Sequence, residues 1–117
     1  MKKKILQIIH VGDNMYWEII IITKNYENIA KCFLSYSTHL NCRYSTCEMH
    51  IHSDFITIDI YPYSTSLRGH KADLVYIDDD IYENEEMRAS YFAPIALHGA
   101  ILPLSKLLWR LKSQSNN

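Results

Sequence analysis

The stretch Tyr16-Trp17-Glu18-Ile19-Ile20-Ile21-Ile22-Thr23 decides the fold class of this chain. Its unbroken run of isoleucines is typical of a β-strand that is covered on both faces, as in the centre of an α/β sheet. Between Asn25 and Leu40 the apolar residues recur at intervals of three and four, which predicts an amphipathic helix. Thr23 or Asn25 can cap the start of that helix. A buried strand followed by a helix therefore indicates an α/β fold.

More strands are predicted on both sides of this unit. Residues 4–10 are rich in β-branched residues and stop at a turn-forming cluster, so they predict a strand. Residues 42–47 are polar and are expected to form a connection. Residues 48–52 and 55–61 alternate between apolar and polar positions, which predicts a β-hairpin. The residues of its second strand that are expected to face the core are Ile56, Ile58 and Ile60.

The C-terminal half adds one more strand and further helices. After a polar loop at residues 63–70, residues 72–77 predict a buried strand that ends in Asp78-Asp79-Asp80. Residues 82–90 are charged and are expected to be helical. A last helix is expected to place four leucines on one side. These are Leu104, Leu107, Leu108 and Leu111. The order of elements predicts a single α/β domain over residues 1–117, with a mixed, mainly parallel sheet, a β-hairpin and flanking helices.

Composition and charge narrow the class of protein. The chain is 48% hydrophobic and 21% charged, and it contains no apolar run of the length that spans a membrane. We therefore expect a soluble protein without membrane contact. The formal net charge of −1 is not that of a polybasic nucleic-acid binder. Three cysteines leave one unpaired in any disulfide scheme, which favours a reducing compartment, so we expect the cytoplasm, or the host cytoplasm for a viral protein.

One motif resembles a known family. Leu74-Val75-Tyr76-Ile77-Asp78-Asp79 has the form of the second acidic motif of P-loop ATPases. With the upstream strand at residues 56–60 and the Arg68-Gly69 loop, the pattern resembles the ATPase core of viral large terminases and related helicases. In that family a strand leads into a loop with Arg-Gly, and the next strand ends in Asp-Glu. The resemblance covers about residues 16 to 90.

The resemblance implies roles for the acidic residues. Asp78 matches the aspartate that binds magnesium, and Asp79 matches the glutamate that orients the attacking water. Asp79 is one methylene shorter than that glutamate and would hold a water differently. The sequence contains no G-x-x-x-x-G-K-[ST] loop, which the family needs to hold the phosphates. We therefore expect a relative of the fold that serves another purpose, with no catalytic residue and no cofactor, although magnesium at Asp78 and Asp79 stays an alternative.

Other interpretations of these residues remain open. Strands often end in aspartate because the acid caps the next helix, and Asp78 to Asp80 precede a predicted helix. His50 and His52 lie two apart on a predicted strand and face the same way, a spacing that can place two imidazoles on one metal. Asp54 or Asp59 could add an oxygen ligand. The simpler interpretation of the two histidines is the exposed face of a hairpin.

Basic and aromatic residues suggest a contact surface. The side chains concerned are Arg43, Tyr63, Arg68, His70 and Lys71. Such a mixture can stack with bases and contact phosphates of single strands, and it is also common where proteins bind proteins. The last helix is expected to be an ordinary core helix, with docking of a partner helix or of a second copy as the alternative.

Three functions follow from these residues. The leading hypothesis is a non-enzymatic accessory protein, plausibly of a phage, that binds a protein partner on a degenerate terminase-like or helicase-like scaffold. A nucleic-acid-binding module is the first alternative. The second alternative is a nuclease dependent on magnesium or manganese and centred on Asp78 and Asp79.

Overall fold

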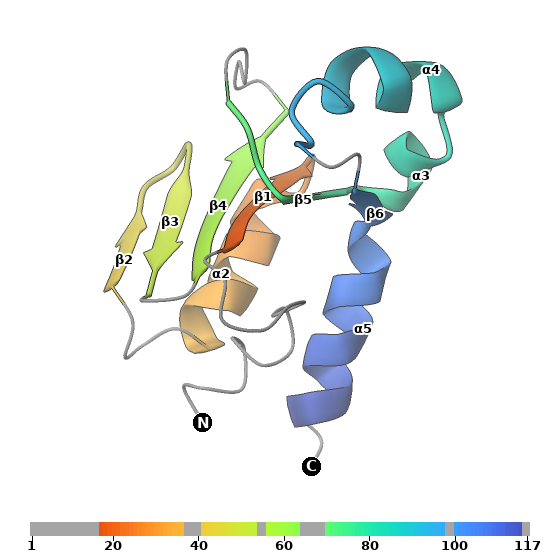
Figure 1. Ribbon diagram of the computed structural model, residues 1–117. Coiled ribbons are helices and arrows are strands. Elements are labelled where there is room, and N and C mark those ends of the chain that lie inside the picture. The colour runs from red at the N-terminus through yellow and green to blue at the C-terminus, as the bar shows by residue number, and fades with distance from the viewer. Residues whose placement is uncertain (1–16, 37–40, 54–55, 64–69, 98–99, 116–117) are drawn as a thin grey trace.

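The structure is a computed structural model that describes residues 17–36, 41–53, 56–63, 70–97 and 100–115. The predicted strand at residues 4–10 and Arg68 lie outside these residues. The sheet has six strands in the order β2-β3-β4-β1-β5-β6 (Figure 1). They are β1 (Trp17–Thr23), β2 (Asn41–Tyr44), β3 (Met49–His52), β4 (Ile56–Pro62), β5 (Leu74–Ile77) and β6 (Ile101–Pro103).

The sheet is mixed, as the sequence predicts. β1 runs parallel to both β4 and β5, and β6 is parallel to β5. β2 with β3, and β3 with β4, are antiparallel pairs, which confirms the hairpin. The fold class predicted from the sequence, an α/β fold with a mainly parallel sheet and a hairpin, is thereby confirmed.

The helices form a layer on each face of the sheet. They are α2 (Tyr26–Tyr36), α3 (Asp79–Tyr82), α4 (Glu85–Met87), a π-helix (Arg88–Phe92) and α5 (Leu104–Ser115). The apolar residues of α2 and α5 join one core cluster with Ile19 and Ile21, whereas Phe92 belongs to a second cluster with Ile20 and Ile22. β1 is therefore covered on both faces, which explains its unbroken isoleucines. Among the described residues, no helix is long and apolar enough to cross a membrane.

The structure differs from the predicted secondary structure in three places. Residues 41–44 form β2 at one edge of the sheet, where a polar connection is predicted, because an edge strand exposed to solvent shows no apolar alternation. Residues 101–103 form the short strand β6, which the pattern does not reveal. The helix predicted for residues 82–90 begins earlier, directly after Asp78, and is divided into α3, α4 and the π-helix. Ile56, Ile58 and Ile60 are buried, as predicted.

Candidate functional site

The carboxyl ends of the parallel strands β1, β4 and β5 meet at one edge of the sheet. Thr23 is the last residue of β1, Tyr63 follows β4, and Asp78 follows β5. Open α/β sheets generally bind their ligands outside this edge. The edge also holds the acidic motif, so it is the candidate site.

Asp78 joins β5 to the end of β1. One of its carboxylate oxygens accepts a hydrogen bond of 2.8 Å from the Thr23 hydroxyl. The other accepts a hydrogen bond of 2.8 Å from the backbone N–H of Lys24. Asp78 stands at the N-cap position of α3, but its side chain makes no capping hydrogen bond there. Its carboxylate therefore serves the neighbouring strand and not the helix that follows it.

Asp79 and Asp80 have different partners. The Oδ1 atom of Asp79 accepts a hydrogen bond of 3.0 Å from the backbone N–H of Ser105, in the first turn of α5. Asp80 forms an ion pair with the Lys24 ammonium and accepts a hydrogen bond from the Ile81 N–H. That contact with Lys24 lowers the pKa of Asp80, and the same hydrogen bond raises the pKa of Lys24. Both groups are exposed, so salt screens their attraction.

Tyr63 lies near the acidic residues. Its hydroxyl is buried and has no hydrogen-bond partner among the described residues. Burial, and next the charge of Asp78, raise the pKa of Tyr63 well above its ordinary value. Its ring contacts Phe92 at a centroid distance of 6.5 Å. Tyr63, which the sequence suggests as a contact residue, is thus packed against the π-helix.

The chemistry of this edge follows from these contacts. All three carboxylates accept hydrogen bonds from protein groups, and the Lys24 ammonium contacts that of Asp80. A triphosphate at this edge would meet three negative charges without the loop of amides and lysine that anchors it in P-loop proteins. Magnesium at Asp78 and Asp79 stays an alternative, and at Asp78 the ion would have to share two oxygens that already accept hydrogen bonds.

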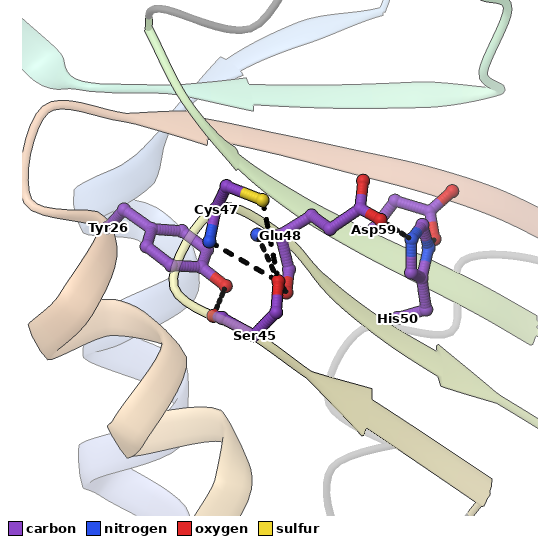
Figure 2. A network of polar contacts seen from close by, with 6 residues as sticks. All are labelled: Tyr26, Ser45, Cys47, Glu48, His50 and Asp59. Atoms are coloured by element: carbon purple, nitrogen blue, oxygen red, sulfur yellow. Dashed lines mark hydrogen bonds and ion pairs between the residues drawn. The ribbon is translucent and has the colours of Figure 1, made fainter.

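A second polar cluster lies on the hairpin, around His50 (Figure 2). The Nδ1 atom of His50 is 2.5 Å from the Oδ1 atom of Asp59 on β4. Its Nε2 atom is 3.4 Å from the Oε1 atom of Glu48. A neutral imidazole has one N–H, so only the protonated ring can donate to both carboxylates. The cluster joins β3 to β4 in the part of the sheet that is nearest the β2 edge.

A metal site at His50 and His52 stays a prediction. Both histidines do face the same way on β3, as their spacing requires, but each contacts a different β4 residue. His52 Nδ1 lies 3.3 Å from the Thr57 hydroxyl, while His50 faces Asp59. Within the described ranges, no group of three or more His, Cys, Asp or Glu side chains is arranged to hold a metal ion.

The turn between β2 and β3 is tied to α2. The Tyr26 hydroxyl donates a hydrogen bond of 2.7 Å to the carbonyl oxygen of Ser45 (Figure 2). The Ser45 hydroxyl oxygen accepts hydrogen bonds from the backbone N–H groups of Cys47 and Glu48. The first residue of α2 therefore fixes the turn that leads into the Glu48 and His50 cluster.

Two buried tyrosines predict a loss of stability at high pH. Burial raises the pKa of Tyr26 to about 12, and burial followed by the charge of Asp59 raises the pKa of Tyr61 to about 12. The ordinary value is 10.0. Because both tyrosine pKa values are higher in the folded protein than in the unfolded chain, the free energy of unfolding is unaffected below the ordinary value. It falls as the pH rises from about 10 to about 12, because the unfolded chain then loses its phenol protons more readily. Urea unfolding at increasing pH, with phenolate absorbance as the second signal, measures this loss.

Tyr61→Phe is the control for that experiment. Without the phenol, the fall in the free energy of unfolding over this pH range should become smaller, because one fewer phenolate must form in a buried place. An unchanged fall in Tyr61→Phe would contradict the assignment to Tyr61.

The predicted contact residues are only partly brought together. Arg43 is exposed on β2 and is paired in register with His50. His70 meets the Tyr61 ring edge-on at 5.9 Å, and Tyr61 meets the His50 ring at 6.0 Å. Arg43 and His70 therefore flank one cluster. The Lys71 ammonium instead donates a hydrogen bond of 2.6 Å to the carbonyl oxygen of Pro94.

Sequence reasoning missed the partners of the acidic residues. Thr23 is fully buried, and its hydroxyl oxygen also accepts a hydrogen bond from the Asn25 N–H. A signal for it exists in the sequence, since Thr23 and Asp78 both directly follow apolar runs that predict buried parallel strands. Asp59 lies opposite His50 in the register of the hairpin, and Glu48 lies on the same face because it is two residues before His50. Both positions could have been read from the alternation of residues.

Comparisons with known proteins identify the fold. No protein-family model matches this chain, and no curated protein matches its sequence. Three crystal structures of the large terminase from a thermophilic bacteriophage, one in complex with ADP, match with TM-scores of 0.50 to 0.51. The sequence identities are 13 to 14%, and the matches cover 85% of this chain but 27 to 28% of the terminase chain. This chain therefore has the fold of part of a terminase and spans less than a third of its length.

Proposed function

We propose that this chain is a non-enzymatic accessory protein of a phage that acts by binding a protein partner, on a scaffold with a terminase-like fold. The observation that carries the proposal is the double hydrogen bond of Asp78 to Thr23 and Lys24. By its resemblance to terminases, Asp78 matches a magnesium ligand, but here its side chain joins β5 to β1. The absence of a G-x-x-x-x-G-K-[ST] loop from the sequence agrees with this use.

The test is ATP hydrolysis by the purified chain with magnesium. We expect phosphate release no faster than in buffer alone, because the sequence contains no G-x-x-x-x-G-K-[ST] loop to hold the triphosphate. The proposal is wrong if ATP is hydrolysed and the folded Asp78→Asn variant loses that hydrolysis. The same preparation, incubated with DNA or RNA and magnesium or manganese, tests the nuclease alternative, for which we expect no cleavage.

Nucleic-acid binding is the second candidate, favoured by one observation. Arg43 and His70 are exposed on either side of the Tyr61 and His50 rings. Glu48 and Asp59 add negative charge to the same cluster, and that charge opposes contact with phosphates. Binding of a labelled single-stranded oligonucleotide with an affinity that falls steeply as salt rises would favour it over the protein partner.

A further inference from the structure

The outer side of α5 exposes a tryptophan. Leu104 and Leu107 face the core and are 4% and 0% exposed, whereas Trp109 is 69% exposed. Trp109 is the most exposed large hydrophobic residue in the described part of the chain, ahead of Leu97 at 54%. Tryptophan is among the residues that contribute most to binding when a partner covers it. The outer side of α5 is thus a helix face that the described part of the chain leaves uncovered.

The charge of α5 indicates what could cover it. Its twelve residues include three basic residues and no acidic one. Lys106 is exposed one turn before Trp109. A surface of opposite charge would complement this helix and would leave Trp109 in the middle of the contact.

The chain itself carries such a surface on α3 and α4. Residues 79–86 contain five acidic residues and no basic one. Glu83, Glu85 and Glu86 are exposed. α3 and α4 lie beyond the N-terminal end of α5, and α5 runs away from them toward the C-terminus (Figure 1). Within one molecule, α3 and α4 therefore do not run along α5.

We propose that a second copy of this chain docks on α5, so that α5 of each copy lies against α3 and α4 of the other. Each copy then contributes one basic helix and one acidic pair of helices, which is the condition for a closed two-fold dimer. Trp109 supplies the apolar centre of each contact, and Lys106 with Glu85 and Glu86 supplies its charged rim. This inference does not rest on the proposed function, because ATP hydrolysis has no bearing on it.

Sedimentation velocity of the full chain over a range of concentrations tests the dimer. We expect Trp109→Ala to raise the dissociation constant about 30-fold, the effect of losing a residue that dominates an interface. Its free energy of unfolding at a concentration where the wild type is monomeric should be unchanged, since the side chain is exposed. Leu34→Ala, at another exposed apolar residue, should leave the dissociation constant unchanged.

Charge reversal gives an independent test of the orientation. Lys106→Glu alone and Glu85→Lys with Glu86→Lys should each weaken the dimer, and all three changes in one chain should restore it. A monomer at every concentration overturns the proposal, as does a dimer that none of these variants affects. A monomer that binds a different protein through Trp109 also overturns it and assigns this face to that protein.

Discussion

Phe33→Ala is expected to lower the free energy of unfolding by about 3 to 5 kcal/mol, the usual loss when a large buried aromatic side chain is truncated. Phe33 is fully buried on α2. It belongs to the core cluster that contains Ile21 and Ile58 from the sheet and Leu107 from α5. Its removal would leave a cavity where the two helices cover the sheet. Urea unfolding followed by circular dichroism measures the change.

The neighbouring residue provides a matched control. Leu34 is 38% exposed on the same helix, so Leu34→Ala should change the free energy of unfolding by only about 0.5 kcal/mol. Equal losses in the two variants would show that α2 does not present its Phe33 side to the sheet.

The central part of the fold can be predicted from the sequence because each signal there is strong. The isoleucines of β1 alternate between the two core clusters, Ile19 and Ile21 on one side and Ile20 and Ile22 on the other. A strand that must be apolar on both faces leaves an unbroken apolar run. The apolar spacing of α2 is equally plain, since Tyr26, Ile29, Ala30 and Phe33 are all buried.

The edges of the sheet cannot be predicted in the same way. Three of the four residues of β2 are exposed, so its strand conformation depends on hydrogen bonds to β3 and leaves no apolar pattern. β6 has three residues and ends at Pro103, which is too short to show a period. β6 is a strand only because it pairs in parallel with β5, and β5 lies well before it in the sequence.

The candidate site, too, could be predicted from the sequence only in part. The sequence places Asp78 at the tip of a buried strand, and the structure agrees. Its partners follow from the strand order, because β5 lies beside β1 and the register sets Ile22 opposite Ile77. Strand order is a property of the whole sheet, so the sequence marks Thr23 and Asp78 as strand ends but does not show that they are neighbours.

Asp78→Ala is expected to lower the free energy of unfolding by about 2 to 4 kcal/mol, because it removes two charge-assisted hydrogen bonds and leaves the buried Thr23 hydroxyl without its acceptor. Asp78→Asn keeps one carbonyl oxygen as an acceptor and should lose about half as much. Asp80→Ala removes an exposed ion pair and should have a small effect that disappears in high salt. Urea unfolding of the three variants measures the series.

A double-mutant cycle decides whether this loss comes from the contact with β1. Thr23→Val removes the hydroxyl that donates to Asp78, so the two changes together should cost less than their sum, with a coupling of about 1 kcal/mol or more. Additive losses would contradict the contact.

Magnesium provides a separate test of Asp78. If Asp78 were a magnesium ligand, magnesium would raise the free energy of unfolding of the wild type through linkage and would not do so in Asp78→Asn. Because the oxygens of Asp78 already accept from Thr23 and Lys24, we expect magnesium to leave both proteins unchanged.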